Sequence, residues 1–309
     1  MLWGQAVGDA LGTTVEFQGP SAIAGRDGGD GWPGELVGAG PFHLLPGQVT
    51  DDTELALALA RTLAAHHAYD DDAVAAAYVA WFASGPPDFG QATQRAFGGA
   101  GLPARGLAEA LRRRADPATQ ANGSLMRASP LGLFGCSLPR EALGALAARD
   151  SSLSHPHPVC QAACAVFTVT VAEAVSGELD GRALYDFAVA FARSSPLARP
   201  VLDTLVAAGA GPPADSLDRQ GWVRHALQHA FHQLRRGADF EASLVEVVRQ
   251  GGDTDTNACI AGALLGAVAG EAGIPARWRR TVEACRPPRP PAYQCGDLPG
   301  LALALTRGA

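Results

Sequence analysis

Alanine- and leucine-rich stretches dominate the chain and predict a mostly helical protein. The longest of these stretches are Glu54–Ala65, Asp72–Ala83 and Cys160–Val175. Few segments show the alternation of apolar and polar positions, with β-branched side chains, that is typical of a strand. The pattern therefore predicts an all-α fold.

Glycine and proline residues separate the helices with loops. The loops are expected at Gly19–Gly47, Ser84–Pro87, Gly98–Pro103, Gly209–Asp215 and Pro287–Pro291. The segment Gly209–Asp215 has the composition of a domain linker, but two acidic clusters on either side of it are expected to serve one site. We therefore expect a surface loop there, and one compact domain over residues 1–309.

Two glycine series predict closely packed helices. Their members recur every four residues: Gly4, Gly8, Gly12, and then Gly262, Gly266, Gly270. This spacing leaves a bare stripe on one helix face, so that a second backbone can approach. Because each glycine costs about 1 kcal/mol in a helix interior, repeated use indicates a packing role. The alternative is that the first series lies partly in a loop.

Composition excludes several classes of protein. Hydrophobic residues make up 47% of the chain, which is ample for a packed core, and the net charge is −7. An acidic protein is a poor non-specific binder of nucleic acid, which requires a basic field. The chain contains no lysine, which excludes a Schiff-base lysine or the lysine of a P-loop.

The six cysteines form no C-x-x-C pair, so they predict neither a zinc ribbon nor a thioredoxin-type motif. Cys160 and Cys164 lie one helical turn apart and are expected to be buried, reduced thiols. No signal peptide is recognisable, and the longest apolar run, Ala258–Gly270, is too short to span a bilayer. We expect a cytoplasmic protein without a membrane partner.

The first acidic cluster is Thr50-Asp51-Asp52, which precedes a predicted helix. A threonine or aspartate often caps a helix, and acidic residues in the first turn suit the helix dipole. Taken alone, this cluster is best interpreted as a helix cap.

The second cluster, Asp253-Thr254-Asp255-Thr256, follows Gly251-Gly252 and also precedes a helix. It holds more oxygen ligands than a cap needs, and neighbouring carboxylates repel one another unless a positive charge lies between them. Carboxylate and hydroxyl ligands suit Mg²⁺, Mn²⁺ or Ca²⁺ rather than zinc. Two such clusters can hold a pair of metals about 3.5–4 Å apart, and either cluster can cap its helix at the same time.

Five sequence blocks resemble the ADP-ribosylglycohydrolase family. In chain order they are Gly8–Gly12 (GDALG) with Val15–Phe17 (VEF), Pro46–Thr53 (PGQVTDDT), Asn122–Arg127 (NGSLMR) with Pro130, Ser154–Pro156 (SHP) and Gly251–Thr256 (GGDTDT). The blocks run from near residue 4 to near residue 270. The resemblance implies an all-α orthogonal helical bundle with a binuclear Mg²⁺ or Mn²⁺ site in a cleft that faces the core.

The resemblance also implies which residues bind the two cations. Thr50, Asp51 and Asp52 are expected on one side, and Asp253, Asp255 and Thr256 on the other. Asp255 is the best candidate for a bridging ligand.

Glu16 matches the family's active-site glutamate. Cleavage at the anomeric carbon of a ribose needs a group that protonates the leaving atom or activates water. Between Val15 and Phe17, a carboxyl group can have a raised pKa. We assign proton handling or water positioning to Glu16, together with Asp52 and Asp253, against the alternative of an exposed loop glutamate.

The expected substrate contacts are Asn122, Gly123, Ser124, Met126, His155 and Trp222. The amides of the Asn122–Ser124 loop can bind a pyrophosphate or a ribose hydroxyl, although an isolated Asn-Gly pair is usually only a turn. Trp222 can stack on adenine or ribose, or can belong to the core. Arg127 can pair internally instead of binding phosphate.

Three other polar groups are interpreted as non-catalytic. His225, His229 and His232 have metal-like spacing, but a helical wheel places them opposite an apolar stripe, which indicates a solvated polar face. Asp70–Asp72 is expected to cap a helix, and Arg112–Arg114 to form a charged helix face.

The sequence therefore predicts a metal-dependent monomeric hydrolase that removes ADP-ribose from a modified protein side chain or a small acceptor. One alternative is a catalytically silent ADP-ribose-binding or structural relative. The other is a hydrolase of another ribosyl or nucleotide substrate. The linkage that is cleaved stays open.

Overall fold

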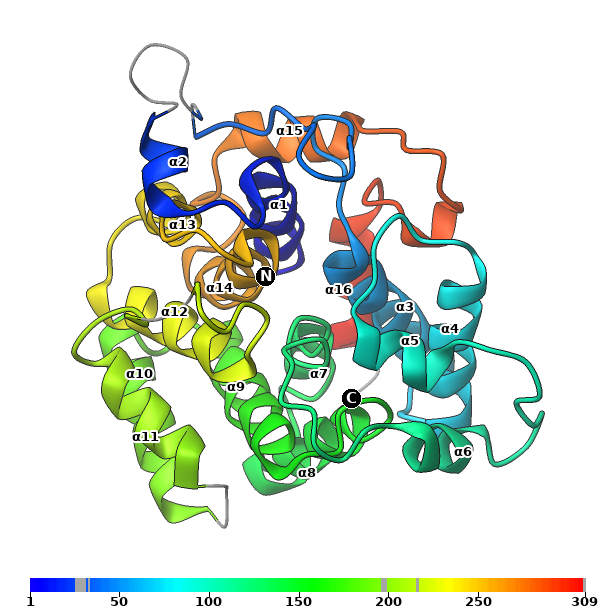
Figure 1. Cartoon of the computed structure of the whole chain (residues 1–309). Coiled ribbons are helices and arrows are strands. Elements are labelled where there is room, and N and C mark those ends of the chain that lie inside the picture. The colour runs from blue at the N-terminus through cyan, green and yellow to red at the C-terminus, as the bar shows by residue number, and fades with distance from the viewer. Residues whose placement is uncertain (26–31, 33, 196–198, 215–216, 308–309) are drawn as a thin grey trace.

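The helix α14 (Thr254–Ala269) is the central element of the structure, because its sequence is apolar on nearly every face. All of its residues from Thr254 to Gly266 are buried. It packs against α1 (Leu2–Gly12), α12 (Val223–Arg236), α13 (Phe240–Arg249) and α9 (Pro158–Ser176) (Figure 1). A helix without a polar stripe is stable only when neighbours surround it in this way.

The computed structural model describes residues 1–25, 32, 34–195, 199–214 and 217–307. The remaining helices are α2 (Pro20–Gly25), α3 (Asp51–His66), α4 (Asp71–Ala83), α5 (Gln91–Phe97), α6 (Leu107–Arg114), α7 (Ser129–Phe134), α8 (Arg140–Ser151), α10 (Gly181–Ser194), α11 (Arg199–Ala208), α15 (Ala276–Ala284) and α16 (Leu298–Thr306). Short 3-10 helices lie at Thr13–Val15 and Pro291–Tyr293. Within these ranges no strand forms, and the helices cross at varied angles (Figure 1). The predicted all-α orthogonal bundle is confirmed.

The three long helices predicted from composition are present as α3, α4 and α9. The prediction was less accurate in the loops, since the expected loop Gly19–Gly47 contains the short helix α2. Residues 26–31 and 33 of that loop, and Asp215 of the expected surface loop, lie outside the described residues.

The glycine series bring α1 and α14 into backbone contact, as predicted. A Cβ atom at Gly4 would lie 2.1 Å from the carbonyl oxygen of Gly262, and one at Gly8 would lie 2.0 Å from that of Ala258. Gly270 does not belong to this stripe, because α14 has already ended; its φ of +65° and open surroundings show a residue that terminates the helix.

The prediction of a solvated histidine face on α12 is wrong. The side chains of His225 and His229 are buried, while that of His232 is half-buried. The reason is that α12 is covered on several sides, by α9, α10, α11 and α14. A helical wheel separates polar from apolar faces but does not reveal how many neighbours a helix has.

The acidic triplet at the start of α4 contacts both α6 and α8. Asp70 caps α4 as predicted. Asp71 forms ion pairs with Arg112 and Arg149, and Asp72 accepts hydrogen bonds from backbone amides at the start of α6. Arg112 therefore belongs to an ion-pair network and not merely to a charged face.

Among the described residues, α9 has the length and hydropathy of a membrane-spanning helix, unlike the shorter run at Ala258–Gly270. Its mean hydropathy is 1.6, but 72% of the apolar window is buried inside the protein. It packs against α8, α7 and α10, as a core helix does. Cys160 and Cys164 lie on it as buried free thiols, as expected.

The contact between α1 and α14 generates a stability prediction. The substitution Gly8→Ala should lower the free energy of unfolding by roughly 2 kcal/mol or more, because its Cβ would overlap rigid backbone of α14. Gly211→Ala is the control, since nothing lies within 4 Å of a Cβ there. Urea denaturation measures both; equal stability of Gly8→Ala and the wild type would contradict the close packing.

Candidate active site

Asp9 of α1 fixes the beginning of α3. Its carboxylate accepts hydrogen bonds from the backbone amides of Thr50 (3.1 Å) and Thr53 (3.0 Å) and from the Thr50 hydroxyl (3.0 Å). The expectation that the first cluster caps its own helix is therefore wrong, since the Thr50 side chain makes no cap hydrogen bond. Because Asp9 performs the capping, the carboxylates of Asp51 and Asp52 remain available for a ligand.

The backbone that follows α1 pairs with the glycines that precede α14. The Phe17 amide donates to the Gly252 carbonyl (2.7 Å), and the Gly252 amide donates to the Gln18 carbonyl (2.9 Å). Gly251 has a φ of +73°, and a Cβ there would lie 2.4 Å from the Gln18 carbonyl oxygen. This pairing holds Glu16 beside the start of α14.

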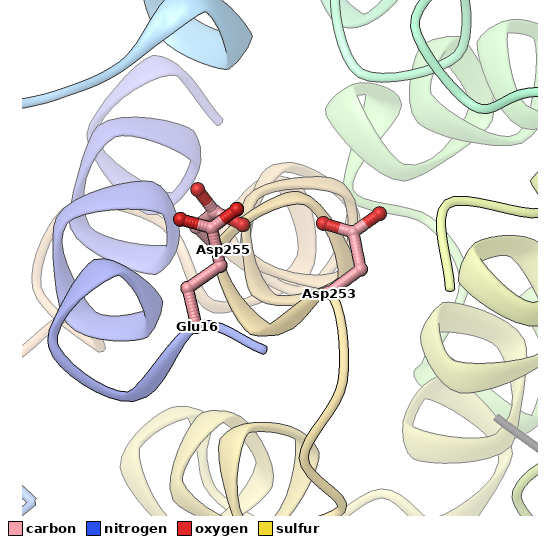
Figure 2. Close-up of side chains that lie close together, drawn as sticks. All are labelled: Glu16, Asp253 and Asp255. Atoms are coloured by element: carbon pink, nitrogen blue, oxygen red, sulfur yellow. The ribbon is translucent and has the colours of Figure 1, made fainter. Parts of the chain in front are cut away.

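As a result, Glu16, Asp253 and Asp255 form one buried acidic cluster (Figure 2). One carboxylate oxygen from each lies within 4.8 Å of the others. Asp253 precedes α14 without capping it through its side chain, whereas Oδ1 of Asp255 accepts a hydrogen bond from the Thr256 amide in the first turn (2.8 Å). Figure 2 shows Glu16 and Asp255 side by side, with Asp253 on the approach to the helix.

The two clusters lie within electrostatic reach of each other. Burial, followed by the charges of Glu16 and Asp52, raises the pKa of Asp255 well above its usual range. Burial likewise dominates at Asp51 and Asp52, whose pKa values are also raised by neighbouring carboxylates. Burial and then the charge of Asp253 raise the pKa of Glu16 to about 9. This direction shows that the site favours neutralisation of its negative charge.

The donor set fits a divalent cation. Two buried carboxylate oxygens, Oδ1 of Asp52 and Oε2 of Glu16, have no hydrogen-bond partner among the described residues. Buried acceptors without partners are costly in a folded protein. Hard cations prefer such carboxylate oxygens, so these residues could hold a metal.

A pocket of about 490 Å³ opens onto the acids. Glu16, Asp51, Asp253 and Thr256 line it, whereas Thr50, Asp52 and Asp255 lie behind its surface. No arginine is among the described residues that line it. The pocket therefore combines acids predicted from both clusters, more than two hundred residues apart in the chain.

Most of the predicted substrate-contact residues also meet at this pocket. Gly123, Met126 and His155 line it, as does Asn122, whose amide nitrogen donates to Asp253 (2.7 Å). The side chain of Ser124 points elsewhere, because its buried hydroxyl accepts a hydrogen bond from Ser151 (2.9 Å).

Trp222 lies beside the pocket instead of lining it. Its indole nitrogen donates to Gln120 (3.1 Å), and the guanidinium groups of Arg219 and Arg224 lie within 5 Å of its ring centroid. The preceding residue, Gly221, is the one that lines the pocket.

Sequence reasoning missed several residues at or behind the pocket, among them Asp9, Asp88 and Thr93. Asp9 stood in a recognised block, but its capping of α3 depends on a contact across the chain. Asp88 and Thr93 line the pocket and belong to no recognised block. The only local signal was that Asp88 directly follows the predicted loop Ser84–Pro87.

Comparisons with known proteins identify the family of the chain. The model of the ADP-ribosylglycohydrolase family matches residues 1–308. An ADP-ribosyl-dinitrogen reductase glycohydrolase from Rhodospirillum rubrum is 31% identical, over 89% of this chain and 86% of its own. An ADP-ribosylarginine hydrolase from Pseudomonas putida is 30% identical, over 90% of this chain and 71% of its own.

A solved structure has the same fold. A chain of an ADP-ribosylglycohydrolase-related protein complex superposes with a TM-score of 0.78 at 30% sequence identity. The match covers 99% of this chain and 95% of that one. From its end-to-end match to the family model, the chain belongs to the ADP-ribosylglycohydrolase family.

Proposed function

We propose that this enzyme uses two divalent cations, Mg²⁺ or Mn²⁺, to release ADP-ribose from a modified protein side chain by hydrolysis of the ribosyl glycosidic bond. The observation that carries the proposal is the convergence of carboxylates from three segments on a pocket whose described lining residues include no arginine. So much buried negative charge requires compensation, and bound cations supply it.

The residues that would hold the cations come from both clusters. They are Thr50, Asp51 and Asp52 from the start of α3, and Asp253, Asp255 and Thr256 from the start of α14. When bound, the cations polarise the ribose hydroxyls and a water molecule as Lewis acids. The hydrogen bond from Asn122 orients Asp253, and Oγ1 of Thr50 lies 3.0 Å from Oδ2 of Asp52.

Glu16 is our candidate for proton transfer. Its carboxyl group lines the pocket and has one buried oxygen without a partner. A carboxyl group with a raised pKa can hold a proton near neutral pH and deliver it to the leaving atom, or take one from water. Asp253 lines the same pocket and can share this task, whereas Asp52 lies behind the surface and serves better as a ligand.

Asp88 supports an arginine linkage as the first substrate to test. It lines the pocket and is only partly buried, and its Oδ1 accepts from the adjacent Phe89 amide (2.7 Å). A carboxylate at this position can pair with a guanidinium group through charge-assisted hydrogen bonds. The name of the Pseudomonas putida relative specifies ADP-ribosylarginine, which supports the same choice.

We further propose that residues 1–309 act as one cytoplasmic domain, as a monomer, without nucleic-acid or membrane partners. The net charge of −7 supports the exclusion of nucleic acid. Two alternatives compete with this proposal: a catalytically silent ADP-ribose-binding protein, and a hydrolase of another nucleotide sugar. An assay of ADP-ribose release distinguishes both from the proposed enzyme.

The purified enzyme should release ADP-ribose from ADP-ribosylated protein in the presence of Mn²⁺ or Mg²⁺. A chelator should abolish release, and renewed metal should restore it, because the acidic ligands cannot act without the cations. Chromatography of the products on arginine-linked, serine-linked and nucleotide-sugar substrates measures the outcome. Binding of ADP-ribose without turnover of any substrate would favour the silent-protein account.

The Asp255→Asn variant should lose more than about a hundredfold in kcat, because a bridging ligand is removed. Without metal, the variant should be at least as thermally stable as the wild type, since one of several repelling carboxylates is neutralised. Asp203→Asn is the matched control, because Asp203 is exposed and its partner among the described residues is Arg199. Full activity of Asp255→Asn would refute the bridging role.

The Asp88→Asn variant should lower kcat/KM for an arginine-linked substrate by roughly tenfold or more, the value of a hydrogen bond to a charged group. Turnover of a serine-linked substrate should change by less than about threefold, since that acceptor carries no cation. Steady-state kinetics on the two substrates provide the comparison, again with Asp203→Asn as the control. An equal loss of kcat/KM on both substrates would show that Asp88 does not recognise the acceptor side chain.

A further inference from the structure

His155 places one edge of its ring against the pocket. Its Nδ1 atom lies 2.8 Å from the Ser154 hydroxyl oxygen, deep in the protein. The opposite edge lies against Gly123, where a Cβ would be 3.0 Å from Cε1 and 3.2 Å from Nε2. Both His155 and Gly123 line the pocket, and no described residue makes a hydrogen bond to Nε2.

The partner of the Ser154 hydroxyl determines where the imidazole proton lies. Nη1 of Arg127 donates to the Ser154 oxygen (2.8 Å). A guanidinium has only donors, and a hydroxyl has one hydrogen, so that hydrogen is free to be donated to Nδ1 of His155. In the opposite tautomer Nδ1 would donate, and the hydrogen of the fully buried Ser154 would have no acceptor among the described residues. That arrangement carries the penalty of an unsatisfied buried group.

Arg127 is itself held rigidly, so it can fix Ser154. The side chains of Arg127 and Asp150 are 0% and 1% exposed and form an ion pair at 3.2 Å. The guanidinium also lies 4.5 Å from the ring centroid of Tyr78. Arg127 therefore pairs internally, one of the two roles the sequence left open.

The same surroundings keep the imidazole neutral. Burial, and then the positive charge of Arg127, lower the pKa of His155 to about 3. With Nδ1 accepting from Ser154, the remaining proton is on Nε2, at the pocket. Thr93 lies at the same part of the pocket, because its hydroxyl oxygen would be 3.3 Å from a Cβ at Gly123.

We infer that Arg127 and Ser154 are positioning residues that hold His155 in its neutral Nε2–H form, so that it donates a hydrogen bond to an acceptor oxygen of the substrate beside Gly123 and Thr93. A phosphate or sugar oxygen satisfies this site, whereas an amine or ammonium donor does not. The identity of the substrate oxygen that accepts this hydrogen bond rests on the proposed function, whereas the tautomer of His155 does not.

The tautomer can be read directly from the nitrogen chemical shifts of histidine in the full-length protein labelled with nitrogen-15. The His155→Gln variant assigns the signals of His155 by their loss. In the wild type Nδ1 should have the shift of an unprotonated nitrogen and Nε2 that of a protonated one. In Ser154→Ala the two tautomers should mix, and Ser154→Thr, which keeps the hydroxyl, should restore the wild-type pattern.

Binding and kinetics test the consequence for the substrate. Ser154→Ala should raise KM, and the Kd of ADP-ribose, about tenfold with little change in kcat, the effect of one hydrogen bond. In a His155→Ala background the same change should have no further effect, as a double-mutant cycle requires. Ser243→Ala, which removes a distant buried hydroxyl on α13, is the control and should leave KM unchanged. Weakened binding of ADP as well as of ADP-ribose would assign the acceptor to the ADP part; weakened binding of ADP-ribose alone would assign it to the terminal ribose.

A protonated Nδ1 in the wild type would overturn the inference, and so would a Ser154→Ala variant with unchanged tautomer and unchanged KM. Failure of the proposed function is distinguishable, because the wild type would then release no ADP-ribose while the nitrogen shifts would still report the tautomer.

Discussion

The backbone contact between α1 and α14 is the constraint on which the rest of the site depends. At the last glycine of α1, a Cβ on Gly12 would lie 2.4 Å from the Cα atom of Asp255. The end of α1 therefore touches the beginning of α14. That contact places Glu16, which follows α1, beside Asp255. Asp9, which belongs to α1, lies at the start of α3. Three short segments separated by long stretches of chain thereby share one acidic site.

This arrangement gathers negative charge in a buried place, which folding alone disfavours. Asp9 caps α3, so the carboxylates of Asp51 and Asp52 do not perform that task. The nearby cation Arg127 is occupied by Asp150 and does not reach the pocket. Among the described residues no arginine lines the pocket to offset the charge of the acids, which is the condition under which bound cations stabilise a site strongly. On the other side of the pocket, Arg127 fixes the Ser154 hydroxyl, which in turn holds the neutral side chain of His155 in one tautomer.

The sequence carried the features that depend on local pattern. The helices, the glycine stripes and both acidic clusters were recognisable, because helix periodicity and the chemistry of a ligand set depend on residues that are close together in the sequence. The features that failed depend on long-range packing. The burial of His225 and His229 follows from how many helices cover α12, and the capping by Asp9 follows from the α1–α3 contact. Asp88 was missed because one aspartate after a loop has no distinctive neighbours. The orientation of the Ser124 side chain away from the pocket likewise could not be predicted, because it depends on a buried hydrogen-bond partner, Ser151.

The central claim is that two cations occupy the space between the acidic clusters. Anomalous X-ray scattering from a crystal of the full chain grown with Mn²⁺ tests it most directly. The account predicts two peaks about 3.5–4 Å apart, bounded by Asp51 and Asp52 on one side and by Asp253 and Asp255 on the other. A map without a peak there, at saturating Mn²⁺, would contradict it.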